Sequence, residues 1–464
     1  MKVALLTLGC DKNTVDSERY LAQLLDHGAE ETRELSEAEL IIVNTCGFID
    51  AAKRESIDAI VRAGRLKIEG AAQAVVAVGC MIERHGVELA ATLPEVDLFL
   101  GASEMEHLLP RLREKGLIGD AVTLHPGIRT YAGATPQVRY LKVSEGCDHG
   151  CAFCAIPLMR GKHRSFSLDE IVHEAQLLEM QGAREVNLVA QDLAHYGRDR
   201  RDGVRLPELL EALVRETSIT WLRNLYLYSA GITPRLLDVV AREPRVLRYL
   251  DMPIQHASDT VLERMRRPER RATIREKVAR FRDAVPGLAI RTTCIVGFPG
   301  ETDADFSQLL DFLEEMQFER VGAFTYSAQE GTRAAEYVDD VPESLKRERL
   351  ERLTELQRSI TAVRYETRIG ERARALVEQG AHDEDGERIS ASARLPWQAD
   401  DIDGLTWLDL DAPAGAFVEV EVTDVVDDYD FHARVLGIPD VAPVPRNVAR
   451  SRELPLASIG SFGR

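Results

Sequence analysis

The feature that most constrains the fold of this chain is a repeated alternation of short apolar runs with segments that have helical spacing of apolar residues. In the first part of the sequence the apolar runs are Val3–Leu8, Leu40–Asn44, Ala74–Val78 and Val96–Leu100, and the helical segments are Asp16–His27 and Ala51–Ile68. Alternating strands and helices form a parallel sheet with helices on its faces. We therefore predict a Rossmann-like α/β domain over residues 1–125.

The alternation restarts after a stretch containing Gly and Pro, residues 125–136, which we predict to be a linker. The predicted strands are Arg139–Val143, Glu185–Val189, Trp221–Tyr228, Arg248–Ile254, Ala289–Val296 and Arg320–Tyr326, and helices lie between them, as at Leu168–Met180, Pro207–Glu216, Pro234–Arg242 and Asp305–Met316. Six βα units favour a partial (βα)6 TIM-type barrel over residues 133–366. Catalytic groups of such barrels lie at the carboxyl ends of the strands.

The C-terminal part has a different pattern. A long charged helix, Glu343–Tyr365, precedes short alternating runs such as Trp407–Leu410 and Phe417–Val426, which Gly and Asp interrupt. This pattern predicts a small antiparallel β-barrel over residues 367–437. The remaining residues, 438–464, contain Pro and Ser and are predicted to be a poorly ordered tail.

Composition narrows the class of protein. The first apolar run is too short for a signal peptide, and no stretch of about 20 apolar residues could span a membrane. We therefore predict a cytoplasmic protein without a membrane segment. The 464 residues carry a formal net charge of −19. This charge argues against a chain built mainly to bind phosphate backbones and favours a partner with a basic surface.

The chain has seven cysteines, and an odd number without a signal peptide favours thiolate ligands or catalysis over disulfides. Three of them, here called the central trio, form the pattern C-x3-C-x2-C directly after a predicted strand: Cys147, Cys151 and Cys154. Three thiolates on one loop leave one iron of a 4Fe–4S cluster open to a small ligand. A zinc knuckle would need a fourth ligand, and His149, inside the loop, is a poor candidate. We predict a 4Fe–4S cluster.

Three further cysteines, the N-terminal trio, each follow one of the first predicted strands: Cys10, Cys46 and Cys80. The carboxyl ends of parallel strands are where open α/β sheets bind ligands. Their spacings of 36 and 34 residues form no local motif, so three ligands and three buried core cysteines both remain possible. Cys294 lies within a predicted strand among apolar neighbours, and we predict a structural role for it.

Stretches of sequence from residue 1 to about residue 437 match one family pattern. They are Leu8-Gly-Cys-Asp-Lys-Asn, Asn44-Thr-Cys-Gly-Phe-Ile, Val78-Gly-Cys-Met, Glu145-Gly-Cys-Asp-His-Gly-Cys-Ala-Phe-Cys-Ala-Ile-Pro with Arg160-Gly, Asp251-Met-Pro-Ile-Gln-His, Ile295-Val-Gly-Phe-Pro-Gly-Glu-Thr and Tyr326-Ser-Ala-Gln-Glu-Gly-Thr. Through these stretches the chain resembles the radical S-adenosylmethionine methylthiotransferase family.

The resemblance implies the cofactors and their sites. The central trio would be catalytic and hold the cluster that cleaves S-adenosylmethionine to a 5′-deoxyadenosyl radical, which abstracts a hydrogen from the substrate. The N-terminal trio would ligate a second 4Fe–4S cluster, from which a methylated sulfur species is transferred. Gln191, Asp192, Gly297 and Glu301, at strand ends, are placed to bind S-adenosylmethionine, although turn formation explains the glycine equally well. A flavodoxin- or ferredoxin-like protein would donate electrons.

Members of this family modify either tRNA adenosines or an aspartate of ribosomal protein twelve of the small subunit. The C-terminal barrel resembles the TRAM domain, which helps to hold RNA in the tRNA enzymes. Here, however, residues 371–437 contain 17 acidic side chains, five arginines and no lysine, a balance of −12. Such a surface, to which we expect Asp400, Asp401, Asp403, Asp427 and Asp428 to contribute, repels phosphates and attracts a basic protein.

We therefore predict methylthiolation of the β-carbon of the aspartate, and no direct RNA binding by the C-terminal barrel. Two alternatives remain. One is methylthiolation of a tRNA adenosine, which tight, salt-sensitive tRNA binding would favour. The segment Arg264–Arg282 has Arg or Lys at nine positions and could contact RNA, but a solvated helix face explains it better. The other is a non-catalytic Fe–S electron carrier or redox sensor, which failure to cleave S-adenosylmethionine would favour.

Overall fold

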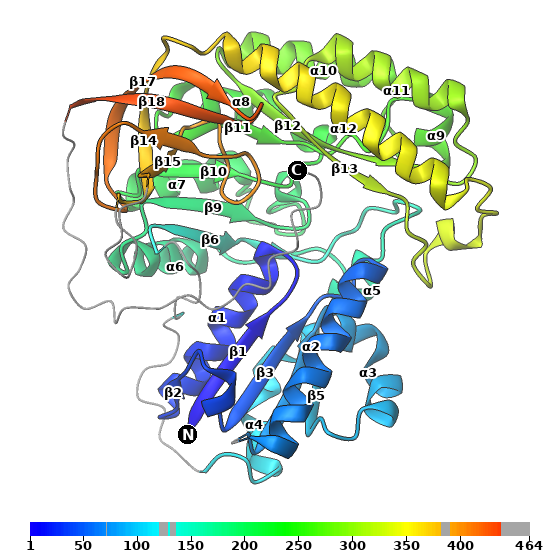
Figure 1. Cartoon of the computed structure of the whole chain (residues 1–464), viewed down its shortest axis with the longest axis vertical. Helices are drawn as coiled ribbons and strands as arrows, with labels where there is room; N and C mark the ends of the chain where they lie inside the picture. Colours follow the sequence, from blue (N-terminus) through cyan, green and yellow to red (C-terminus); the bar gives the residue numbers. More distant parts are fainter. Residues whose placement is uncertain (71, 120–128, 130–135, 382–389, 438–464) are drawn as a thin grey trace.

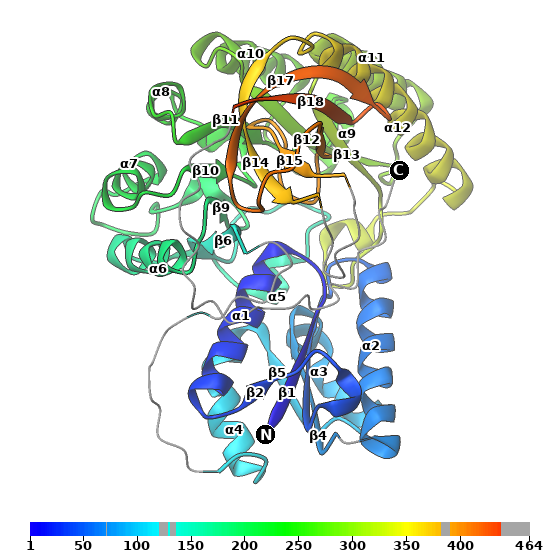
Figure 2. The same ribbon diagram turned by 60° about the vertical axis from the view of Figure 1, so that its left-hand side comes forward.

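The computed structural model describes residues 1–70, 72–119, 129, 136–381 and 390–437. The predicted tail and most of the predicted linker lie outside these ranges. The described residues form an N-terminal sheet domain, a central sheet with its helices, and a C-terminal barrel beside the central sheet (Figure 1; Figure 2). No helix among them combines the length and apolar composition needed to cross a membrane.

The N-terminal sheet is parallel, with the strand order β2-β1-β3-β4-β5. Its elements are β1 (Lys2–Thr7), α1 (Asp11–Asp26), β2 (Glu30–Glu31), β3 (Leu40–Thr45), α2 (Asp50–Glu69), β4 (Ala74–Gly79), α3 (Cys80–Thr92), β5 (Leu98–Gly101) and α4 (Leu108–Glu114). This is the doubly wound order of flavodoxin-like folds. Alternate residues of β1 enter separate cores on the two faces of the sheet, Ala4 and Leu6 on one face and Val3 and Leu5 on the other. Sequence reasoning missed β2, since its two glutamates carry no apolar signal.

The central sheet is also parallel, and its strands follow chain order, β6-β9-β10-β11-β12-β13, as a partial (βα)6 barrel requires. Its strands are β6 (Val138–Lys142), β9 (Glu185–Val189), β10 (Trp221–Asn224), β11 (Val246–Asp251), β12 (Ala289–Val296) and β13 (Arg320–Thr325). Helices that pack on it are α6 (Leu168–Met180), α7 (Leu206–Glu216), α8 (Pro234–Arg242), α9 (Asp259–Arg264), α10 (Arg271–Ala284), α11 (Asp303–Met316) and α12 (Glu343–Glu366). Apolar residues of both layers form one large core.

The C-terminal strands close into a barrel in the order β14-β15-β16-β18-β17. They are β14 (Arg372–Gln379), β15 (Ser392–Arg394), β16 (Thr406–Leu408), β17 (Phe417–Val426) and β18 (Asp430–Gly437). The pairings are antiparallel except for that of β16 with β18, which is parallel. The core of this barrel continues into the central sheet, where the rings of Trp221 and Phe417 meet edge to face with centroids 4.9 Å apart.

Ion pairs are buried in the same interface. Glu185 of β9 lies 2.7 Å from both Arg223 of β10 and Arg394 of β15, and all three side chains are fully buried. Asp403 is also fully buried and accepts a hydrogen bond of 2.5 Å from the Tyr249 hydroxyl.

These contacts correct the expectation of an exposed acidic surface at five aspartates. Asp403 is buried, Asp400 pairs with the buried Arg394 at 3.7 Å, and Asp428 pairs with Arg358 of α12 at 2.7 Å. Asp401 and Asp427 are exposed. The acidic balance of this region therefore serves partly to pair with Arg394 of the barrel itself and with Arg358 of the central domain.

Candidate functional site

The N-terminal trio lies at the carboxyl ends of three neighbouring strands. Cys10 follows β1 and caps the amino end of α1, Cys46 follows β3, and Cys80 begins α3 directly after β4. Because β1, β3 and β4 are adjacent and parallel, their ends meet at one edge of the sheet. Residues 70 positions apart in the sequence are thereby brought together.

Glycines next to the cysteines allow these loops to approach closely. Gly9 has φ +97°, and a Cβ atom there would lie 2.8 Å from the Cβ of Cys46. Gly79 has φ +100°, and its Cβ would lie 2.4 Å from Oδ1 of Asn44. Any other residue would separate the loops, so both positions require glycine.

The state of the thiols fits a metal cluster. Burial raises the pKa of Cys46 to about 12 and that of Cys80 to about 11, and the charge of the nearby Cys10 contributes to each increase. All three cysteines are free of disulfides. A raised pKa keeps these thiols protonated until a bound metal displaces the proton, and a soft iron–sulfur cluster suits an all-thiolate donor set.

The central trio lies in the loop between β7 (Ser144–Glu145) and α5 (Ile156–Arg160), beyond the carboxyl end of β6. Backbone hydrogen bonds fix this loop, among them Cys147 N to Gly161 O (3.1 Å) and Ala152 N to Met265 O (2.9 Å). Burial raises the pKa of Cys147 to about 11 and that of Cys154 to about 12, with the charge of Cys151 contributing to both. These thiols therefore fit a cluster for the same reason.

Arg160 connects the two trios. It ends α5, the helix that follows Cys154, and its Nε donates to the Sγ of Cys80 at 3.1 Å. Its Nη2 donates to Oδ1 of Asn13 at 2.6 Å, and its Nη1 to Asp16 at 2.6 Å. From the sequence, Arg160 was recognised only as part of a motif. Its contact with Cys80, which joins two domains, was not predicted.

A buried polar network surrounds Arg160. Lys142 of β6 is 2% exposed and pairs with Asp16 of α1 and, at 2.6 Å, with Glu145. Glu145 also accepts a hydrogen bond of 2.7 Å from Nε2 of Gln191. Burial opposes the ionisation of Glu145, but Lys142 and Arg160 outweigh it and lower its pKa to about 2. This network holds the edge of the N-terminal sheet against the central sheet.

Comparisons with known proteins agree with this arrangement. Residues 2–101 match the family described as uncharacterized protein family UPF0004, and residues 141–313 match the radical SAM superfamily. A protein of Anaeromyxobacter sp. (strain K) named ribosomal protein uS12 methylthiotransferase RimO is 45% identical, covering 94% of this chain and 93% of its own length. The protein of the same name from Geobacter sulfurreducens is 41% identical, covering 94% of this chain and 99% of its own.

The chain belongs to the RimO family. A solved structure supports the fold alone: the radical S-adenosylmethionine methyltransferase TsrM from Kitasatospora setae is 15% identical, with a TM-score of 0.52 over 69% of this chain and 72% of that protein. The sequence-based identification of the family and of its fold class is thus confirmed.

Two of the pocket residues predicted for this RimO-family chain follow β9. Asp192 accepts hydrogen bonds from His149 at 2.6 Å and from His195, and these bonds hold its pKa well below the ordinary value although burial opposes this. His149, Asp192 and His195 lie close enough together to bind a metal ion, with ligand atoms within 4.8 Å of one another. The ring of His149 also stacks on the ring of Tyr228, and the two ring centroids are 4.0 Å apart. Asp192 thus fixes the loop of the central trio, a role that sequence reasoning missed.

The other two predicted pocket residues follow β12. Glu301 is 4% exposed and accepts hydrogen bonds from the backbone of Gly297 at 2.8 Å and from Arg349 at 2.9 Å. Gly297 has φ +71°, and a Cβ there would meet the side chain of Lys346 at 2.3 Å. Both residues shape the turn, and their assignment to an S-adenosylmethionine pocket stays a prediction.

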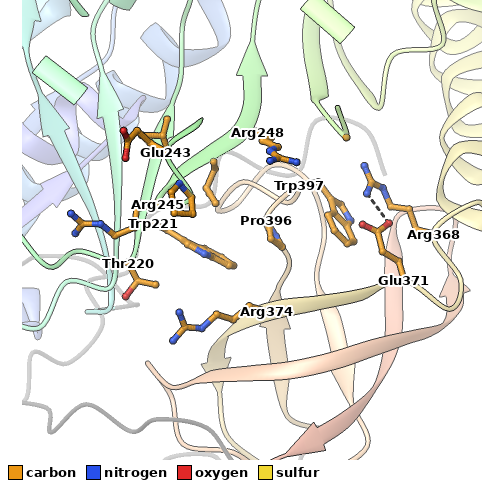
Figure 3. A pocket seen from close by; sticks show the side chains of 14 residues that line it. Thr220, Trp221, Glu243, Arg245, Arg248, Arg368, Glu371, Arg374, Pro396 and Trp397 are labelled. Carbon is orange, nitrogen blue, oxygen red and sulfur yellow. Dashed lines mark hydrogen bonds and ion pairs between the residues drawn. The ribbon is translucent and has the colours of Figure 1, made fainter. Parts of the chain in front are cut away.

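A cavity of about 640 Å³ lies elsewhere, at the amino ends of β10 and β11. Figure 3 shows Trp221 of the central sheet and Trp397 of the C-terminal barrel on opposite sides of it. Arg245 in its lining donates to the carbonyl groups of Thr217 and Ile219, just beyond the end of α7. Arg245 thus stabilises the end of α7, and the central trio lies at the opposite end of the strands of this sheet.

Proposed function

We propose that this chain methylthiolates the β-carbon of an aspartate in ribosomal protein uS12 by radical S-adenosylmethionine chemistry. The observation that carries the proposal is the pairing of two cysteine trios across one interface, linked by Arg160, in a chain of the RimO family. An electron carrier needs no second trio in contact with the segment that follows the first, as Cys80 is with Arg160 and Met159.

We assign the central trio (Cys147, Cys151, Cys154) and the N-terminal trio (Cys10, Cys46, Cys80) as ligands of one 4Fe–4S cluster each. When bound, the central cluster supplies the reductive cleavage of S-adenosylmethionine, and the N-terminal cluster supplies sulfur transfer. We divide the chain into domains at residues 1–125, 133–366 and 367–437, with a tail at 438–464.

The protein itself positions the reacting groups. Behind the central loop, buried apolar side chains form a small core that includes Ala152, Met265 and Phe298. Arg267 stacks on the ring of Tyr228 at 4.0 Å and directs Nη1 towards the Sγ of Cys151 at 3.8 Å. Such a fixed environment favours radical chemistry by holding the reactants in line.

Partners follow from this chemistry. A flavodoxin- or ferredoxin-like donor would reduce the central cluster, and a ribosomal substrate places the reaction in the cytoplasm. Exposed acidic residues of the C-terminal barrel, Asp409, Asp424 and Asp427 among them, favour a basic protein over tRNA. Most arginines of Arg264–Arg282 that have described contacts bind carbonyl groups or carboxylates of the chain itself, as Arg282 does at the end of α11. Methylthiolation of tRNA is therefore not favoured.

The test combines iron analysis with mass spectrometry. Anaerobically reconstituted protein should hold about eight irons and the variant C147A/C151A/C154A about four, given four per cluster. The matched control is C294A, because Cys294 is fully buried in the central core and should bind no iron. Wild-type protein with S-adenosylmethionine and a reductant should add a methylthio group to uS12. Unchanged iron in the triple variant would contradict the ligand assignment, and modification of tRNA instead of uS12 would contradict the substrate.

A further inference from the structure

Lys12 is a buried cation at the domain interface that has no anionic partner in the part of the chain that the structure describes. It lies in the first turn of α1, two residues after Cys10, and is 7% exposed. Among the described residues, no carboxylate oxygen lies within 4.0 Å of its Nζ. Burying an ammonium group without a counter-charge is costly, so such a group is rarely retained for stability alone.

The ammonium group packs on an aromatic ring of the central domain. Nζ lies 3.1 Å from the ring centroid of Tyr226, which follows the carboxyl end of β10. The Tyr226 hydroxyl donates to Oδ2 of Asp11 at 2.8 Å, and this bond engages the carboxylate nearest in sequence to Lys12. Tyr226 itself has φ +59°, an unfavourable conformation that a hydrogen bond from its N–H to Asp251 stabilises at 3.1 Å.

This position lies between the two trios. On one side, Lys12 is two residues from Cys10 of the N-terminal trio. On the other side, the carbonyl group of Tyr226 accepts a hydrogen bond from the N–H of Leu193 at 2.9 Å. Leu193 follows Asp192, which binds His149 in the loop of the central trio at 2.6 Å. A group bound by Lys12 would therefore be near both sets of cysteines.

Other buried cations at this interface have carboxylate partners. Lys142 pairs with Asp16 and Glu145, and Arg160 pairs with the same two residues. The contrast between Lys12 and Lys142 is informative, since both are lysines, both are more than nine-tenths buried, and both lie on the surfaces that join α1 to the central sheet.

We propose that Lys12 binds the side-chain carboxylate of the substrate aspartate and thereby selects this residue for modification. The inference rests on the proposed function. The reacting β-carbon is bonded directly to the carboxyl carbon, so an ammonium group that holds the carboxylate also fixes the reacting atom. Asparagine lacks the negative charge, and an adenosine has no carboxylate at all. The ring of Tyr226 supports the ammonium group from the side opposite to the bound anion.

A double-mutant cycle tests the proposal. Anaerobic holoenzyme is compared with its K12M and K12R variants for binding of uS12 that carries either aspartate or asparagine at the modified position. Wild-type enzyme should bind the aspartate form about 10- to 100-fold more tightly, as expected for a hydrogen bond to a charged group. K12M should lose this preference, and K12R should retain part of it.

Controls separate binding from structural damage. K12M should keep its iron content, its cleavage of S-adenosylmethionine without uS12, and its affinity for the asparagine form. The matched control is K53M, because Lys53 is also in the N-terminal domain but pairs with Asp50 at 3.1 Å on the surface. If K12M weakens binding of both forms equally, or keeps the wild-type preference, the proposal is wrong. If wild-type enzyme modifies no uS12 at all, the proposed function itself fails, and this inference fails with it.

Discussion

The central sheet has two domain interfaces, and they are built from different interactions. The C-terminal barrel shares an extended apolar core with the sheet, which includes Trp221, Tyr249 and Phe417. The ion pairs of Glu185 with Arg223 and Arg394 in this interface are fully buried. The N-terminal domain has apolar cores of its own. It contacts the central domain mainly through a polar network, with one small apolar cluster around Cys80 and Met159.

The apolar interface is suited to attaching the barrel, and the polar interface is suited to positioning the N-terminal domain. Hydrophobic burial is strong but non-directional, so it suits permanent attachment of the barrel. Charged hydrogen bonds are directional, so they can set the position of one loop relative to another. The two cysteine trios and Lys12, which has no carboxylate partner among the described residues, lie at the polar interface. The chemistry is therefore expected where the domains meet through hydrogen bonds.

The largest effect is expected at the barrel interface, from R394M. Arg394 is fully buried and pairs with Glu185, Glu378 and Asp400. Its loss removes the cation that pairs with Glu378 and Asp400 and leaves Glu185 with Arg223 alone, which should destabilise the protein by about 3–5 kcal/mol. Urea unfolding of apoprotein measures this, with R372M as control, because Arg372 pairs with Glu421 on the surface. Equal midpoints for the two variants would show that the barrel does not depend on its buried ions.

At the polar interface, R160K should affect catalysis more than folding. Lysine keeps the charge but cannot reach Cys80, Asn13 and Asp16 together as the guanidinium does. We expect methylthio transfer to fall about 10- to 100-fold, as for loss of a residue that orients metal ligands. Formation of 5′-deoxyadenosine should change little. A parallel loss of both products would mean that Arg160 supports the central cluster instead.

The polar interface should also respond to acid. The pKa of Glu145 is lowered from an ordinary value of 4.5 to about 2 by Lys142 and Arg160, against burial. A lowered pKa contributes stability above the ordinary value, and this contribution disappears as the pH falls towards the folded-state value. Wild-type protein should thus be more stable than E145Q at pH 6, by an amount that shrinks steadily between about pH 4.5 and pH 2. The unfolding midpoints of both proteins are measured across this pH range. A stability difference that does not change with pH would contradict the lowered pKa of Glu145.

The smallest effect is expected from the exposed acids of the barrel. The triple variant D409K/D424K/D427K should slow association with uS12 a few-fold at low salt, and the difference should vanish as salt screens the charges over about 8 Å at physiological ionic strength. Stopped-flow association rates against salt concentration measure this. If the variant and the wild-type protein associate with uS12 at the same rate at every salt concentration, the barrel is not part of the docking surface.

Much of the fold was predictable because its signals are local. Residues 185–189 and 289–296 are strands, and 168–180 and 234–242 are helices, with the predicted bounds, since their apolar spacing reflects one buried face. The predicted bounds were wrong where contacts with distant parts of the chain determine where an element begins or ends. Helix α1 begins at Asp11 and not at Asp16, because its polar first turn is buried against the central domain. Strand β10 ends at Asn224, shortly before the positive φ of Tyr226.

The sequence by itself determined the central trio, because three cysteines within eight residues must share one loop. It also determined the alternation of strands and helices from which both parallel sheets follow. Only the tertiary structure decided which strand ends are neighbours, and hence that the N-terminal trio meets at one edge. It also decided the partners of charged groups, as for Lys142 and Asp16, 126 residues apart. Periodicity reports which face of an element is buried, whereas the partner of a buried charge depends on chain segments that no local pattern relates.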